Sequence, residues 1–169
     1  AYMYGIPYSL YEKYASRRYG FHGTSHRYVS KQGCDALGVP YEEQRIITAH
    51  IGNGGSLAAI KGGKSIDTSM GMTPVEGLLM GTRSGDVDAG IISFIMEKEN
   101  IGTQAISTLV NKPIGLLGIY GVSSDMRDIR AAIEEGNDRA KLAFEMFVYR
   151  IKKHIGDETP VLGCSTLLI

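Results

Sequence analysis

The chain has 169 residues, which is enough for one domain with a sizeable core. Its 18 basic and 18 acidic residues cancel, so no overall field attracts nucleic acid or an anionic membrane. No apolar run approaches the length of a membrane span. The two cysteines, Cys34 and Cys164, show neither metal-ligand spacing nor a framework of pairs, which favours a reduced, cytoplasmic setting.

The 22 glycines are an excess for a globular chain of this size. They gather at turns between predicted strands rather than in a low-complexity tract, which favours phosphate loops and tight corners over disorder. The chain starts at AYMYGIPYSL without an initiator Met and ends on the apolar run Cys164–Ile169. We therefore expect a piece cut at both ends.

The first predicted elements are a short helix and a loop that carries a histidine. Residues 10–15 could form one or two helical turns, and Tyr19 and Phe21 alternate like a short strand. Gly20 and Gly23 then leave little bulk around His22, whose imidazole could point at an anion. The alternative is a buried histidine hydrogen-bonded to a carbonyl, which the residues alone favour.

A helix is predicted next, over residues 26–37. Ser25 is a plausible N-cap and Gly38 a plausible stop. We expect His26, on this helix, to be a structural partner. The buried side of the helix would carry Tyr28, Val29, Ala36 and Leu37.

An antiparallel meander of three strands is predicted after residue 44. Residues 45–51 and 56–60 flank the turn Gly52-Asn53-Gly54-Gly55, and Asn-Gly between such runs is a strong hairpin signal. The additional glycines leave consecutive N–H groups able to face one phosphate, although an ordinary hairpin is the alternative. The turn Gly62-Gly63 leads into a third strand over 64–69. Asp67, near its end, could cap a turn or orient a metal shell.

The passage Met70–Arg83 has neither helical nor strand period, and a loop of this kind is usually functional. We expect Arg83 to stand just before a helix over 86–98, with Val87, Ile91 and Ile95 on one apolar face. The helix macrodipole opposes an arginine there, so its position does not serve helix stability. Its fork of donors suits phosphate oxygens or a carboxylate.

The remainder of the chain reads mainly as helices. Residues 102–111 form one opened by Thr103, with Ile106, Leu109 and Val110 facing inward, and residues 113–118 read as a glycine-punctuated loop. Ser123-Ser124 would cap a helix that starts near Asp125 and stops at Gly136. A last helix runs from an Asn137 cap to Gly156, and a strand is predicted over 161–169.

Three motifs resemble the acetate kinase family, which belongs with actin, the sugar kinases and the Hsp70 ATPase. They are RRYGFHGTSH at 17–26, HIGNGGS at 50–56 and DTSMGMTPVEGLLMGTRSGD at 67–86. The similarity runs in register from about Tyr4 to Gly156. It implies an RNase H-like α/β fold, with residues 1–169 as the central part of the second, C-terminal domain and the N-terminal domain absent.

The resemblance also implies roles for individual residues. His22 matches the histidine that stabilises the transferring phosphoryl group, and Arg83 matches the arginine that contacts the phosphoryl or acyl group. The matches to the nucleotide-binding positions are His50, Ile51, Gly52, Asn53 and Gly54 for the phosphate loop, and Asp125, Met126 and Arg127 beside the adenosine. An alternative for Asp125 is that it only favours a helix N-terminus.

The activity implied is phosphorylation of acetate by ATP to acetyl phosphate, with propionate kinase as a close alternative. The resemblance implies that the Mg²⁺ ligands, a substrate arginine and a catalytic aspartate lie outside this chain. The chain alone would then be inactive. The alternative from a different functional class is a truncated, non-catalytic nucleotide-binding module. The intact protein would be a cytoplasmic homodimer acting on small molecules, without nucleic-acid or membrane partners.

Overall fold

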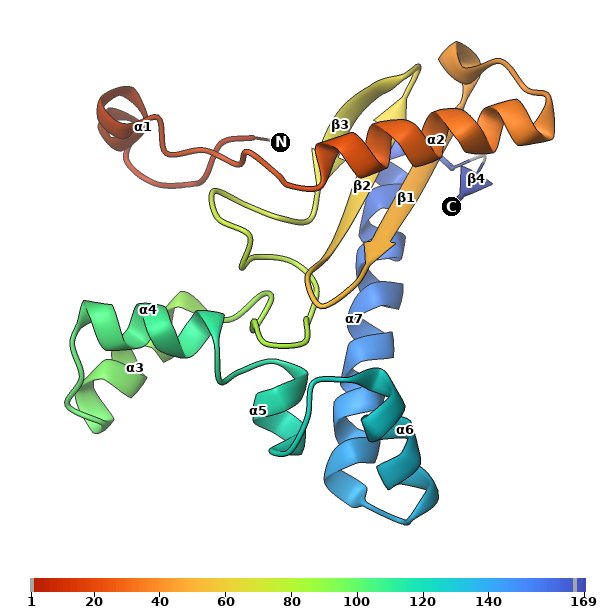
Figure 1. The fold of residues 1–169 in the computed structure, drawn as a ribbon. Helices are drawn as coiled ribbons and strands as arrows, with labels where there is room; N and C mark the ends of the chain where they lie inside the picture. The colour runs from red at the N-terminus through yellow and green to blue at the C-terminus, as the bar shows by residue number, and fades with distance from the viewer. Residues whose placement is uncertain (1, 166) are drawn as a thin grey trace. The chain divides into compact units, whose positions relative to one another are not determined.

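The computed structural model describes residues 2–165 and 167–169. They divide into two compact units, which are described separately (Figure 1). The first unit comprises Ala1–Ile51, Gly55–Gly77 and Lys152–Ile169, and the second comprises Gly52–Gly54 and Leu78–Ile151.

The first unit is built around a sheet of four strands in the order β3-β2-β1-β4. The strands β1 (Arg45–Ile51), β2 (Gly55–Lys61) and β3 (Lys64–Thr68) form the predicted antiparallel meander. The short strand β4 (Leu167–Leu168) adds to β1 in parallel. Residues of β2 are buried from Gly55 to Ile60, which explains why its apolar run does not alternate.

The helices of the first unit are α1 (Tyr8–Tyr14), α2 (Gly23–Leu37) and the 3₁₀ turn η1 (Tyr41–Glu43). Figure 1 shows α2 running across the strands, and it packs on β1. A core cluster there contains Cys34, Ile46 and Ile60, with Val39, Tyr41, Leu167 and Ile169 packed against it. Burial raises the pKa of the Cys34 thiol, so this cysteine is held as an inert apolar group.

Several predictions for the first unit are wrong in detail. Residues 19–21 form no strand, and only an isolated bridge joins Met3 to Arg17. The helix α2 begins at Gly23, so Ser25 lies inside it and is not its cap. Its buried residues are His26, Ser30 and Cys34, whereas Tyr28 and Leu37 are exposed. The buried face of α2 therefore carries polar side chains that are hydrogen-bonded within the unit. The apolar pattern predicted that the opposite face would be buried.

The second unit consists of the glycine turn Gly52–Gly54, an irregular loop and helices. The helices are α3 (Ala89–Lys98), α4 (Thr103–Asn111), α5 (Leu116–Tyr120), α6 (Met126–Glu134) and the first part of α7 (Asp138–Leu162). Their core contains Leu79, Leu116, Ile129, Ala132, Ala140 and Ala143. Ile106 is the buried residue of α4, as predicted, with Leu109 and Val110 half-buried.

Helix boundaries in this part of the chain differ from the prediction at three places. The helix α3 starts at Ala89, capped by the Asp88 side chain, so Arg83 does not directly precede a helix. The predicted loop 113–118 contains the start of α5. The helix α7 continues past Gly156 to Leu162, which reduces the predicted strand 161–169 to Leu167–Leu168; Thr166 lies outside the described residues.

Candidate functional site

The first unit brings together a histidine cluster, formed by His22, His26 and His50. The rings of His22 and His50 stack with centroids 3.9 Å apart and an interplanar angle of 19°. Each is held at Nδ1 by a serine, since His22 Nδ1 lies 2.8 Å from Ser56 Oγ and His50 Nδ1 lies 2.9 Å from Ser25 Oγ.

The backbone of His22 adopts an unusual conformation. The residue occupies the N-cap position of α2 with φ 61° and ψ 21°, in the left-handed region. For a residue other than glycine this conformation costs about 1–2 kcal/mol. Strain of this kind gathers at functional sites. It is therefore consistent with a catalytic task for His22, which stays a prediction.

His26 connects the cluster to the sheet. Its Nδ1 lies 2.7 Å from Thr48 Oγ1, and its Nε2 lies 2.7 Å from Ser56 Oγ. Burial, followed by the proximity of His22 and His50, lowers the pKa of His26 to about 4, so the ring is neutral at physiological pH. The prediction that His26 is a structural partner is confirmed. Ser56 and Thr48 were not among the residues predicted from the sequence. A hydroxyl side chain inside an otherwise apolar strand is the signal that could have indicated them.

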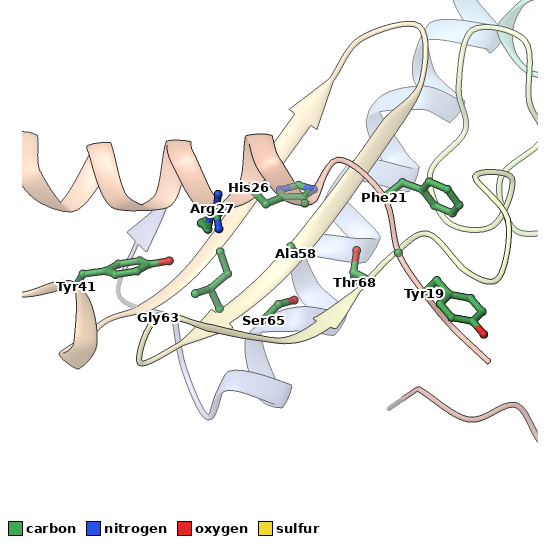
Figure 2. A pocket seen from close by; sticks show the side chains of 12 residues that line it. Tyr19, Phe21, His26, Arg27, Tyr41, Ala58, Gly63, Ser65 and Thr68 are labelled. Atoms are coloured by element: carbon green, nitrogen blue, oxygen red, sulfur yellow. The ribbon is translucent and has the colours of Figure 1, made fainter. Parts of the chain in front are cut away.

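A pocket of about 310 Å³ lies beside the start of α2 (Figure 2). Its lining includes Tyr19 and Phe21 from the loop before α2, Tyr41 from η1, and Thr68 from β3. His26 also contributes to this lining, so the pocket borders the histidine cluster. The two aromatic residues of the wrongly predicted strand therefore line a cavity rather than pair with a sheet.

The second unit brings the glycine turn and Arg83 together. A Cβ atom added to Gly54 would lie 3.1 Å from Arg83 Nη1, which places the guanidinium directly against the turn. The Gly81 amide donates to the Asn53 carbonyl at 2.9 Å, and a Cβ on Gly81 would collide with Asn53 Oδ1. An arginine fork resting on a glycine turn is an arrangement suited to phosphate oxygens.

The backbone on either side of Arg83 is held by the start of α5. The amides of Leu116 and Leu117 donate to the carbonyls of Met80 and Gly81 at 2.9 and 3.0 Å. Gly115 has φ +74°, and a Cβ there would lie 2.6 Å from the Arg83 carbonyl oxygen. The α5 start therefore requires glycine at residue 115 to approach the loop this closely.

The third predicted site segment lies at the start of α6. Asp125 is its N-cap, accepting a hydrogen bond from the Arg127 amide at 2.8 Å, as the alternative interpretation expected. The same carboxylate accepts from Arg127 Nε and Nη2 at 3.0 and 2.6 Å. Hydrogen bonds from Arg127 lower the pKa of Asp125 to about 2. Met126 packs against the helical core.

The remaining predicted site residues are placed as follows. Ile51 lies exposed at the end of β1. Within the described part of the chain, no hydrogen bond or ion pair joins Gly52–Gly54 to residues 125–127. His22 and Arg83 belong to different units.

The residues that the structure describes form neither a cluster of metal ligands nor a membrane-spanning helix. They contain no group of three or more His, Cys, Asp or Glu residues able to hold a metal ion. Asp67 lies within β3, where its Oδ1 accepts from the Thr68 amide at 2.8 Å. Over the same residues, no helix is both long and apolar enough to cross a bilayer.

Solved structures place this fold among the acetate and propionate kinases, which have the actin, Hsp70 and sugar kinase fold. The crystal structure of Porphyromonas gingivalis acetate kinase matches with a TM-score of 0.98 at 57% identity, covering 99% of this chain and 42% of that one. A propionate kinase from Francisella tularensis matches with a TM-score of 0.88 at 44% identity, covering 93% and 40%. The predicted fold class is thereby confirmed.

The chain belongs to the acetokinase family, whose model matches residues 1–167. It is 66% identical over 169 residues to an acetate kinase of Azobacteroides pseudotrichonymphae. It is 62% identical over the same length to the acetate kinase of Parabacteroides distasonis. The chain spans 43% and 42% of the lengths of these relatives.

Proposed function

We propose that the intact protein is an acetate kinase, which transfers the terminal phosphoryl group of ATP directly to the carboxylate of acetate. The observation that carries the proposal is the position of the Arg83 guanidinium against the Gly52–Gly54 turn. Phosphoryl transfer needs little covalent chemistry from the protein, but it needs positioning and neutralisation of charge. An arginine fork beside a glycine turn is suited to both. The high identity to acetate kinases supports acetate as the acceptor.

The proposed roles follow from the chemistry of each group. Arg83 and His22 are proposed to contact the transferring phosphoryl group, whose equatorial oxygens gain charge in the transition state. Residues His50 to Gly54 are proposed to hold the nucleotide phosphates. The segment Asp125–Arg127 is proposed to lie against the adenosine, where the Asp125–Arg127 pair keeps the start of α6 rigid. These assignments rest on the motif matches.

Mg²⁺ is general to phosphoryl transfer from ATP and neutralises charge between its phosphates. The described residues do not form a metal site of their own. We therefore propose that its ligands lie in the part of the protein outside this chain. The tasks proposed for this chain are to bind phosphates through backbone amides and to stabilise the transferring group through Arg83 and His22.

A second candidate is propionate kinase, because a structure of that name aligns with 93% of this chain. Both activities share the phosphoryl chemistry and differ in the size of the acyl group accommodated. In either case we propose a cytoplasmic homodimer acting on small molecules. The alternative of a different class is a truncated, non-catalytic nucleotide-binding module.

The experiment that tests the proposal compares acetate with propionate in the intact protein. With ATP and Mg²⁺, formation of the acyl phosphate is followed as its hydroxamate, and kcat/KM should be higher for acetate. A higher value for propionate would favour the second candidate. The isolated 169-residue chain should be inactive in the same assay. If the intact protein binds ATP but phosphorylates neither acid, the non-catalytic alternative is correct.

A further inference from the structure

A row of hydrogen bonds connects the interior of the sheet to His22. It runs from Thr48 Oγ1 to His26 Nδ1 at 2.7 Å, from His26 Nε2 to Ser56 Oγ at 2.7 Å, and from Ser56 Oγ to His22 Nδ1 at 2.8 Å. Thr48, Ser56 and His26 are 1%, 0% and 6% exposed, so bulk water does not compete for these bonds. We call Thr48, His26 and Ser56 the relay.

The neutral state of His26 makes the relay directional. A neutral imidazole has one N–H donor and one bare acceptor nitrogen, so His26 can donate to only one of its two hydroxyl partners. Ser56 Oγ can accept from both rings but can donate to only one of them. The bonds therefore all point toward His22, all point away from it, or meet at Ser56, which would leave the buried Ser56 hydroxyl hydrogen without an acceptor among the described residues. The direction therefore decides whether Nδ1 of His22 accepts a hydrogen bond or donates one.

The hydroxyl hydrogens decide the direction. If the bonds pointed away from His22, Thr48 would only accept, and its own hydroxyl hydrogen would need another acceptor. Among the described residues, His26 is the only side-chain or backbone partner recorded for the Thr48 hydroxyl. A buried hydroxyl hydrogen without an acceptor costs about 1–3 kcal/mol. With the bonds pointing toward His22, each hydroxyl hydrogen and the His26 N–H have an acceptor.

We propose that Thr48, His26 and Ser56 are positioning residues that place the proton of neutral His22 on Nε2. Ser56 donates to Nδ1, and the Nε2–H of the ring becomes its hydrogen-bond donor. The use of that donor, toward the oxygens of a phosphoryl group, rests on the proposed function. Protonation of His22 at Nδ1 would make Ser56 accept from that nitrogen, which would either reverse the relay or leave the buried Ser56 hydroxyl hydrogen without an acceptor among the described residues. The relay therefore favours a bare Nδ1.

The two neighbouring histidine rings also disfavour a positive charge on His22. The rings that face His22 are His50, stacked at 3.9 Å, and His26, at 6.4 Å between centroids. A positive charge on either would oppose an imidazolium at His22. A neutral ring at His22 avoids this repulsion.

The first test locates the proton in the intact protein. Nitrogen-15 NMR of histidine-labelled protein distinguishes protonated from bare ring nitrogens, and a His22→Gln variant assigns the His22 signals. We expect Nε2 protonated and Nδ1 bare at pH 8. A proton on Nδ1 would overturn the proposal. Because this readout needs no turnover, an inactive protein with the proton on Nε2 would refute the proposed function and leave the relay standing.

The second test removes single links of the relay. Ser56→Ala should raise the pH at which His22 becomes an imidazolium, and should lower kcat on the order of tenfold, with the KM for ATP nearly unchanged. Thr48→Val keeps the shape of the side chain and removes only the terminal donor, so it should shift His22 in the same direction. Thr48→Ser restores the hydroxyl and should recover most of the change.

A matched control lies on the neighbouring strand. Thr68 Oγ1 donates to the Leu57 carbonyl at 2.8 Å and has no bond to the relay, so Thr68→Val should leave the His22 proton where it is. A purely structural role would predict equal effects of Thr48→Val and Thr68→Val. If Ser56→Ala and Thr48→Val leave both the proton site and the protonation of His22 unaltered, the relay is refuted.

Discussion

The two units hold their candidate site residues by different means. In the first unit, side chains from separate elements hold one another, as in the hydrogen bonds that join Ser56 of β2 to His26 of α2 and to His22 just before that helix. In the second, backbone approaches backbone at glycines, as where Gly115 lies against the Arg83 main chain. The histidine cluster should therefore be sensitive to the removal of polar atoms, and the Arg83 loop to the addition of carbon atoms.

The same contrast explains which segments are regular. Hydrogen bonds between side chains can be made from helices and strands, and α2, β1 and β2 supply those of the histidine cluster. Close backbone contact requires unpaired amides and carbonyls, which regular elements have already used. The loop from Leu78 to Gly85 has no helix or strand, and the α5 start donates to the carbonyls of Met80 and Gly81. The irregularity of this loop is thus a condition for holding Arg83.

The largest expected effect is that of Arg83→Ala in the intact protein. Turnover should fall on the order of 10³-fold, about 4 kcal/mol, because the fork is proposed to contact charge that develops in the transition state. The KM for ATP should change much less. Arg83→Lys should recover little, since an ammonium keeps the charge and loses the fork. Steady-state kinetics measure both, and turnover of Arg83→Ala within a few-fold of wild type would contradict the proposed role.

The second effect concerns glycine at residue 115. A Cβ would lie 2.3 Å from the Met80 carbonyl oxygen at φ +74°, so Gly115→Ala should lower the free energy of unfolding by about 3 kcal/mol. Gly136→Ala is the matched control, since Gly136 has φ +84° and nothing within 4 Å, and it should cost only about 1 kcal/mol. Urea unfolding of the intact protein measures both. Equal losses would show that close approach is unimportant.

The third effect tests the histidine cluster directly. His22→Ala should lower turnover on the order of 10²-fold, less than Arg83→Ala, because one neutral donor contributes less than a bidentate cation. Tyr28→Ala, an exposed position on the same helix, serves as control and should leave turnover near wild type. An effect of His22→Ala larger than that of Arg83→Ala would reverse the proposed ranking of the two units.

The smallest effect is a pH dependence of stability in the first unit. Burial, with Asp67 and Asp157 adding to it and His154 and Arg18 opposing it, raises the pKa of Glu158 to about 7. Its Oε2 has no hydrogen-bond partner among the described residues. Because the folded protein holds this proton more tightly than the unfolded chain, the stability it contributes is full below about pH 4.5 and is lost as pH rises through about 7.

The variant Glu158→Gln keeps the neutral shape at every pH. It should remove part of the decline in unfolding free energy between pH 5 and pH 8, about 1 kcal/mol. Glu134→Gln, at an exposed position, should leave the decline as it is. Urea unfolding at a series of pH values makes the comparison, and identical slopes for wild type and Glu158→Gln would show that this carboxyl does not titrate in the window.

The sequence by itself determined the strand meander, the family and the candidate site residues. Strand alternation, Asn-Gly turns and glycine stops are local signals, and the structure confirms β1, β2 and β3 almost to the residue. Asn137 caps α7 as predicted, with its side chain accepting from the Ala140 amide at 3.0 Å. The three sequence motifs were long enough to show the resemblance to the acetate kinase family, which the family match over residues 1–167 confirms.

Tertiary structure decided the points where a side chain's partner lies far away in the chain. The polar face of α2 is buried because Thr48 and Ser56 meet it, and helical periodicity alone points to the opposite face. Likewise, α7 passes Gly156 and Pro160 because its packing outweighs their local preference to end a helix. Contact between the glycine turn and Arg83 joins residues 29 positions apart. Local propensity carries no information on such contacts, since they depend on how separate segments pack together.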